Sequence, residues 1–260
     1  LAPLRARFFF VPFTYLKNLL EIMLENSDSI INPTVFIGSL ELREPVTAIT
    51  DFMIAITCGI AVWMLSTNRK ERSDTFNYYR GFFFMYAIGM TAAAWIGHGL
   101  QAYFGPEWKM LGWFCSMTGQ AFLVMASLGD LKRSISIPIQ KVIIGLLIVQ
   151  FVVFGILIIN PETRGFQVPQ TASVLVLAGF VIPLQIMNYL QNKSTGSLLI
   201  VTAIVFGLLP GYVYNNQISV SRWFNYHDIS HLLVVVYMII MIFAIRRLAF
   251  KSGNLSDELN

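Results

Sequence analysis

Histidines carry most of the chemistry that this sequence offers, and the chain has only three of them. His227 and His231 are four residues apart, a spacing that places two imidazoles on one face of a helix. Proteins use this spacing to chelate a metal ion from a single helix. His98 adds a third neutral nitrogen donor, and three histidines with a water form an open tetrahedral zinc site of the catalytic kind.

A carboxylate beside such an ion completes the predicted chemistry. Zinc lowers the pKa of a bound water towards about 7, and a nearby carboxylate then carries the proton. Asp51 is the first candidate for that role, with Glu44 and Asp228 behind it. Asp228 directly follows His227, so on a helix it points roughly 100° away and faces another neighbour. The sequence therefore predicts a zinc cofactor and the catalytic carboxylates Asp51 and Glu44.

The composition indicates which solvent surrounds these residues. Of 260 residues, 56% are hydrophobic and only 12% are charged, whereas soluble domains carry about a quarter charged residues. The net charge of +4 comes from basic residues in short clusters between apolar stretches, a pattern typical of membrane orientation rather than nucleic-acid binding. Cys58 and Cys115 both lie in apolar stretches, which argues against a disulfide framework. Membrane lipids are therefore the expected partners, and nucleic acid is not.

Seven stretches are long and apolar enough to cross the hydrocarbon core, which takes about 20 residues. They cover residues 45–66, 78–102, 108–129, 138–159, 171–191, 196–217 and 226–249. The connections between them are short, so we expect neighbouring helices to run antiparallel. The predicted fold is an all-α membrane protein, a seven-transmembrane helix bundle that forms one domain over residues 45–250.

The two flanks of this domain differ from it. Residues 1–44 are predicted to be an N-terminal amphipathic, interfacial segment, because the stretch 4–24 mixes phenylalanines and leucines with charged residues. Residues 251–260 form a polar tail. Lysines and arginines gather after the first, third, fifth and seventh spans, which predicts a cytoplasmic C-terminus and an N-terminus on the outside.

This topology brings the polar groups together. The first span begins near Glu44 and Asp51, and the second ends just after His98. The seventh span begins at His227 and His231. Because the first and seventh spans run in one direction and the second in the other, Asp51 and the three histidines are expected in one layer of the bundle. Reversing the protein in the membrane moves them together, so this prediction is independent of orientation.

This arrangement resembles the CREST superfamily of seven-transmembrane metal hydrolases, which includes the alkaline ceramidases and the progestin/adipoQ receptors. The features in common are an acidic residue early in the first span, one histidine near the end of the second, and HxxxH at the start of the seventh. The resemblance implies that His98, His227 and His231 hold zinc. It also implies a zinc-dependent intramembrane hydrolase of a lipid amide or ester, with zinc-bound water as nucleophile and a lipid substrate that enters from the bilayer.

Two positions depart from the family pattern and support other hypotheses. The family has a serine four residues before the second-span histidine, where this chain has Ala94, and an aspartate about eleven residues after it, where this chain has Lys109. A second hypothesis is therefore a catalytically inactive relative that acts as a receptor or as an accessory subunit of a membrane protein complex. A third is a haem protein with His98 and one seventh-span histidine as axial ligands.

Overall fold

The computed structural model describes residues 33–67, 74–132 and 134–257, with side chains described as far as residue 248. The chain divides into two units, Leu1–Pro33 and Thr34–Asn260. The amphipathic stretch predicted over residues 4–24 lies outside the described residues. The second unit carries the predicted bundle, and the fold below is that of this unit.

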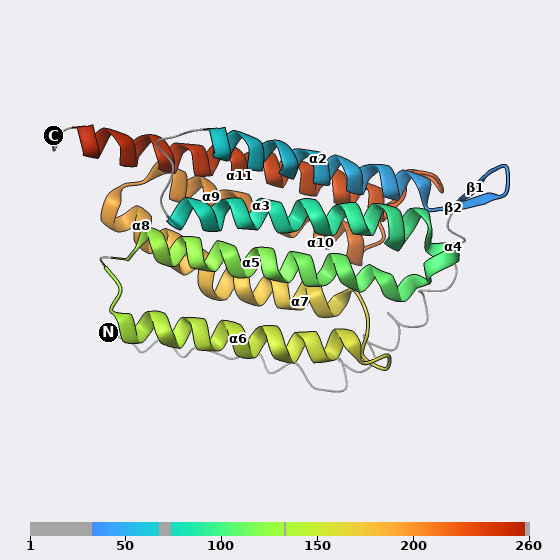
Figure 1. The fold of residues 1–260 in the computed structure, drawn as a ribbon, viewed down its shortest axis with the longest axis horizontal. Helices are drawn as coiled ribbons and strands as arrows, with labels where there is room; N and C mark the ends of the chain where they lie inside the picture. Colours follow the sequence, from blue (N-terminus) through green and yellow to red (C-terminus); the bar gives the residue numbers. More distant parts are fainter. Residues whose placement is uncertain (1–32, 68–73, 133, 258–260) are drawn as a thin grey trace, which may run out of the picture. The chain divides into compact units, whose positions relative to one another are not determined.

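Helices make up nearly all of this unit, and they run up and down along one direction (Figure 1). They are α2 (Pro45–Thr67), α3 (Asp74–Ala92) with its π-helical continuation η2 (Ala93–Gly99), α4 (Gln101–Phe104), the 3-10 turn η3 (Pro106–Lys109), α5 (Met110–Asp130), α6 (Ile137–Ile159), α7 (Gln167–Val176), the π-helical η4 (Leu177–Val181), α8 (Ile182–Asn192), α9 (Thr195–Phe206), α10 (Leu208–Asn215) and α11 (Tyr226–Asp257). The all-α prediction is confirmed. α11 also continues through residues 251–257 of the predicted polar tail.

Six helical segments in the described part of the chain are long and apolar enough to cross a membrane. They are Pro45–Thr67, Pro106–Asp130, Ile137–Ile159, Gln167–Asn192, Thr195–Asn215 and Tyr226–Leu248, which fits an integral, multi-pass membrane protein. α3 corresponds to the second predicted span but is not one of these six, and its first turns carry Asp74, Asn77 and Arg80. It nevertheless lies within the bundle, between α2 and α5.

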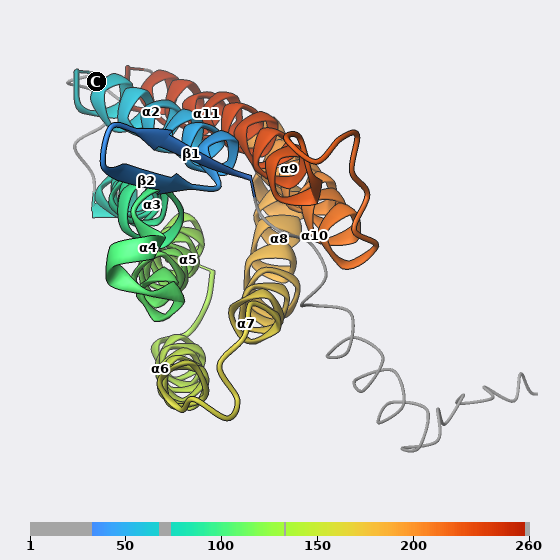
Figure 2. The same cartoon turned by 90° about the vertical axis from the view of Figure 1, so that its right-hand side faces the viewer.

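Viewed end-on, the helices form a ring (Figure 2). α11 packs against α2, α2 against α3 and α3 against α5, while α8, α9 and α11 follow one another on the other side. Buried side chains fill the contacts between these helices, among them Ile54, Phe82, Leu123, Ile200 and Met241. α6 packs mainly on α5 and α7, and its outer face exposes isoleucines, valines and a leucine, as lipid contact favours.

A short β-hairpin precedes α2, which the sequence analysis did not predict. Strands β1 (Thr34–Ile37) and β2 (Leu40–Arg43) pair antiparallel, so this part of the predicted interfacial segment 1–44 is not helical. The turn between the strands contains Gly38, whose φ of +61° suits glycine. The Tyr103 hydroxyl on α4 accepts a hydrogen bond from the Glu41 amide at 2.9 Å. The hairpin is thereby held at the end of the bundle where Glu44 begins the candidate site.

Candidate functional site

The structure brings the three histidines and Asp51 together at one end of the bundle. The centroid of the His98 ring lies 6.1 Å from that of His227 and 6.1 Å from that of His231. The Asp51 carboxylate sits between two of these rings, with Oδ1 3.3 Å from His231 Nδ1 and Oδ2 3.6 Å from His98 Nε2. Helices α2, α3–η2 and α11 thus contribute side chains to one layer. Asp51 is almost fully buried in it, with 1% of its surface exposed.

The backbone around His98 is unusual. His98 belongs to the π-helical turn η2, and π-helical turns are rare and occur frequently at functional sites. The flanking glycines let this turn pack closely. A Cβ added at Gly97 would lie 3.2 Å from Lys109 Cγ, and one at Gly99 would lie 3.0 Å from the carbonyl oxygen of Ala94. The imidazole is therefore placed by a backbone that leaves little room for side chains beside it.

Glu44 fixes the orientation of the His98 ring. Its backbone is left-handed, with φ of 46°, a conformation that costs energy for a residue with a side chain and occurs often at functional sites. Glu44 Oε2 accepts a hydrogen bond from His98 Nδ1, and Lys109 Nζ lies 3.3 Å from the same oxygen. Burial alone would raise the pKa of Glu44, but the His98 hydrogen bond and the charge of Lys109 hold it well below its ordinary value. Glu44 is therefore a carboxylate, and His98 Nε2 keeps its lone pair.

The Thr50 hydroxyl fixes the orientation of the His231 ring in a similar way. Thr50 Oγ1 donates its hydrogen to the carbonyl oxygen of Thr47 at 3.0 Å. It must therefore accept from His231 Nδ1, which lies 3.1 Å away. The hydrogen of His231 is consequently on Nδ1, and Nε2 keeps a lone pair. Two of the three histidines are thus held in the tautomer that a metal ligand requires.

The remaining two predicted residues differ in their surroundings. The His227 ring packs among aromatic rings, 4.3 Å from Tyr226 and 5.2 Å from Tyr214 between centroids. Asp228 faces α2, as its position on the helix predicts, because Thr47 Oγ1 donates to its Oδ1 at 2.7 Å. The Asn225 amide donates to Asp228 Oδ2 at 2.7 Å, an interaction that caps the start of α11. Asp228 therefore acts as a cap rather than as a member of the histidine layer.

The three imidazoles are suitable ligands for zinc, but their rings lie too far apart to share one ion. Zn–N distances of about 2.0–2.1 Å place two imidazole centroids on one tetrahedral ion roughly 5 Å apart, compared with the 6.1 Å seen from His98 to each of the other rings. Accordingly, no group of three or more His, Cys, Asp or Glu side chains within the described residues is arranged to hold a metal. Closing the site requires the rings to approach by about 1 Å.

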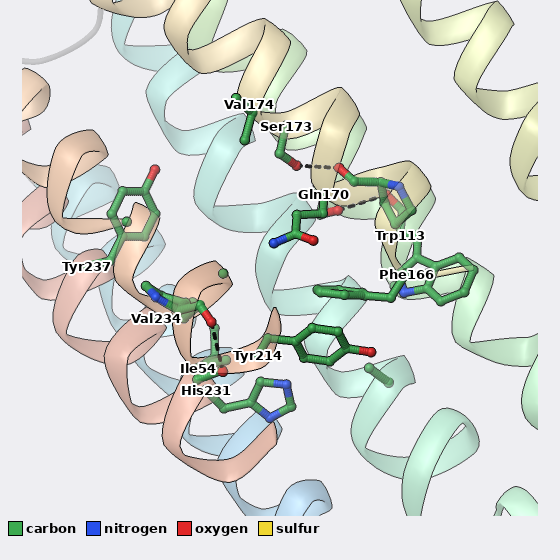
Figure 3. A pocket seen from close by; sticks show the side chains of 18 of the residues that line it. Ile54, Trp113, Phe166, Gln170, Ser173, Val174, Tyr214, His231, Val234 and Tyr237 are labelled. Carbon is green, nitrogen blue, oxygen red and sulfur yellow. Dashed lines mark hydrogen bonds between the residues drawn. The ribbon is translucent and has the colours of Figure 1, made fainter. Parts of the chain in front are cut away.

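The histidines open into a large cavity inside the ring of helices. It measures about 820 Å³ and includes His98, His227, His231 and Asp51 in its wall, within the size range of small-molecule sites. Figure 3 shows His231 on α11 and Ser173 on α7 projecting into it. Several wall residues on α7, α9 and α10 are exposed, among them Val174, Val205, Leu208 and Tyr212.

Sequence reasoning missed two contributors to this site. Lys109 entered it only as a departure from a family pattern, and its contact with Glu44 depends on the close packing of η2 and η3. Thr50 was not considered, although a polar residue directly before Asp51 in an apolar span was a usable signal. Thr50 contacts His231 directly and Lys109 acts on His98 through Glu44, and spacing along the sequence reveals neither contact.

Comparison with known proteins assigns the chain to a family but gives no activity for it. No curated protein and no solved structure matches it. A family profile matches residues 46–249. This range includes Asp51 and all three histidines and begins just after Glu44. The chain therefore belongs to the family of unknown function DUF6962.

Proposed function

We propose that this protein is a zinc-dependent intramembrane hydrolase of a lipid amide or ester. One observation carries the proposal: His98 Nε2 and Asp51 Oδ2 face each other across 3.6 Å. The gap is too long for a direct hydrogen bond, and Asp51 Oδ2 has no hydrogen-bond partner among the described residues. A buried polar atom without a partner is costly. A metal ion with its bound water between the two side chains would give both atoms a partner.

In this proposal each residue has a separate role. His98, His227 and His231 would hold the ion once their rings approach by about 1 Å, while Glu44 and Thr50 orient His98 and His231 through their Nδ1 atoms. When bound, zinc supplies a water acidified to a pKa of about 7 and polarises the carbonyl under attack. Asp51 accepts a proton from the attacking water and returns it to the departing amine or alcohol as the bond to the acyl carbon breaks.

The cavity supports a lipid as the substrate. Its wall is mainly apolar and includes exposed apolar residues such as Val174, Val205 and Leu208. In this proposal a lipid enters from the bilayer and places an acyl chain along the cavity with its carbonyl at the histidines. The same proposal counts α3–η2 as a seventh span, and the basic loops favour an outer N-terminus and a cytoplasmic C-terminus.

Metal analysis of the purified full chain tests the proposal. We expect about one zinc per chain, and loss of nearly all of it in His231→Ala, because two remaining imidazoles bind the ion weakly. Ser230→Ala is the matched control, since Ser230 lies beside His231 but donates to the carbonyl oxygen of Pro210 at 2.9 Å. Wild-type protein without metal would contradict the proposal. Hydrolysis of an N-acyl lipid by the wild type, and not by His231→Ala, is the second expected result.

The resemblance to the CREST superfamily enters as part of this proposal, and its alternatives are outcomes of the same experiment. Zinc bound at one per chain without hydrolysis favours an inactive relative that serves as a receptor or accessory subunit. One observation favours the inactive relative: Lys109, which contacts Glu44 at 3.3 Å, stands where the superfamily has an aspartate. An absorption spectrum with a Soret band would favour haem instead.

A further inference from the structure

A second polar group lies in the cavity wall, away from the histidines. Gln120 on α5 donates through Nε2 to the Tyr86 hydroxyl at 3.1 Å and to Ser173 Oγ at 2.7 Å. Ser173 Oγ in turn donates to the carbonyl oxygen of Pro169 at 2.7 Å. Gln120, Tyr86 and Ser173 all line the cavity. This group, called the glutamine subsite below, joins three helices in an otherwise apolar part of the wall.

The glutamine subsite has hydrogen-bonding capacity left over. Gln120 is 2% exposed, and its Oε1 has no partner in the part of the chain that the structure describes. The Tyr86 hydroxyl accepts from Gln120, and no described residue accepts its hydrogen. Turning the amide over would let the Tyr86 hydroxyl donate to Oε1, but Nε2 would then stand where Oε1 has no partner among the described residues, and Oε1 would face Ser173 Oγ, whose hydrogen goes to Pro169. In the observed orientation one buried acceptor and one buried donor are unused, and in the turned one a buried N–H donor is unused.

The position of the subsite excludes a direct role at the histidines. Tyr86 precedes His98 by about 12 residues on α3–η2, which corresponds to roughly 18 Å along a helix. Gln120 is similarly displaced along α5 from Lys109, which borders the histidines. A ligand group that reaches the subsite is therefore far from any group that reacts at the histidines.

We propose that the glutamine subsite binds a hydroxyl group carried on the apolar chain of the ligand. A hydroxyl both donates and accepts, so it can donate to Gln120 Oε1 and accept from Tyr86, whereas a methylene satisfies neither. The inference rests on the proposed function only in taking the cavity as the substrate site. It adds the substrate class: a lipid hydroxylated along its chain, well away from the carbonyl that is attacked.

Competitive binding to the full chain in lipid nanodiscs tests this inference. The probes are a saturated long-chain fatty acid and its analogue with one mid-chain hydroxyl, each displacing a fluorescent fatty acid. We expect the hydroxylated acid to bind about three- to tenfold more tightly, the range of one or two neutral hydrogen bonds. Gln120→Leu should abolish this preference, mainly by improving binding of the plain acid. Tyr86→Phe should reduce it while leaving the shape of the wall unchanged.

Gln185 provides a matched control. It is also fully buried with an unpartnered Oε1, but it is not among the described residues that line the cavity. Gln185→Leu should therefore keep the wild-type preference. Equal binding of the two acids by the wild type, or binding of neither, would overturn the inference. Zinc content and binding in His231→Ala separate the two proposals, since the preference should survive in that variant even where the metal is lost.

Discussion

Two groups of buried and half-buried polar side chains lie at opposite ends of the same bundle. The histidine cluster consists of Glu44, Asp51, His98, His227 and His231, at the start of α2 and α11 and the end of η2. The sealed cluster consists of Tyr79, Ser127, Asp130 and Gln185, from α3, α5 and α8. In the sealed cluster, the Tyr79 hydroxyl donates to Asp130 Oδ2 at 2.5 Å, and Gln185 Nε2 donates to the same oxygen at 3.1 Å. Each cluster therefore contains an aspartate that contacts side chains of other helices, fully buried at Asp51 and half-buried at Asp130.

The two clusters differ in whether their side chains line the cavity. His98, His227, His231 and Asp51 line the cavity, whereas the cavity wall, as far as the structure describes it, includes no member of the sealed cluster. The hydrogen bonds of Glu44 and Thr50 turn nitrogen lone pairs of His98 and His231 away from the protein's own donors. An aspartate bonded across helices is thus a poor indicator of chemistry by itself. Unused donor atoms with access to a cavity are the better indicator.

Replacing the two aspartates should separate the clusters most strongly. We expect Asp51→Asn to lower the rate of lipid hydrolysis by about 10²- to 10⁴-fold, the usual contribution of a general acid–base group. The amide keeps the shape of the side chain but cannot carry the proton. Asp130→Asn should leave the rate within about threefold, because Asp130 lies in the sealed cluster and contacts no cavity-facing member of the histidine cluster. Rates are measured with N-acyl lipid in nanodiscs at equal amounts of folded protein.

The opposite result would contradict the assignment of the chemistry to the histidine cluster. A large loss of rate in Asp130→Asn with little loss in Asp51→Asn would move the chemistry to the other end of the bundle. Zinc content measured on both variants shows whether a loss of rate comes from the proton carrier or from the metal.

Glu44 sharpens the comparison within the histidine cluster. Glu44→Gln removes the carboxylate that accepts from His98 Nδ1 and leaves Lys109 without its partner. We expect zinc affinity to fall by about 10- to 100-fold, as for other residues that orient a ligating histidine. Competition with a metal indicator measures the affinity. Glu41→Gln is the control, because Glu41 pairs with Arg43 on the hairpin at 2.8 Å; an equal loss in both variants would indicate an effect of the hairpin instead.

Much of the fold and part of the site follow from sequence. Apolar stretches gave helix bounds close to those observed, and antiparallel neighbours place Asp51, His98 and His231 at one depth. The hairpin at residues 34–43 was missed because eight strand residues carry too little periodicity to stand out beside long apolar helices.

The rotation and local winding of helices explain the rest. Glu44 was predicted as a proton carrier, but its left-handed backbone and the π-helical turn at His98 place it against His98 Nδ1. Neither feature has a pattern of residue types that predicts it. Gln120 is a lone amide in an apolar span, and its unused oxygen becomes visible only once its neighbours Tyr86 and Ser173 are known.

Tyr79 tests whether the sealed cluster serves stability. Tyr79→Phe removes the buried hydroxyl that donates to Asp130 and leaves this half-buried carboxylate with the Gln185 donor at the same oxygen. We expect the free energy of unfolding to fall by about 1–3 kcal/mol, with no change in zinc content. Thermal or denaturant unfolding in detergent measures the loss. Tyr78→Phe is the neighbouring control on α3; a loss of zinc in Tyr79→Phe would show that the two ends are coupled.

The smallest effect is expected at Thr50, and it tests the tautomer of His231. Thr50→Val removes the acceptor of His231 Nδ1 while keeping the side chain's shape. Asp51 Oδ1 lies 3.3 Å from the same nitrogen and can accept its hydrogen instead, so zinc affinity should fall by only about three- to tenfold. Thr47→Val is the control, since its hydroxyl donates to Asp228 at 2.7 Å and not to a histidine. A larger loss in Thr47→Val than in Thr50→Val would mean that the capping of α11 positions its histidines more than the hydrogen bond of Thr50 does.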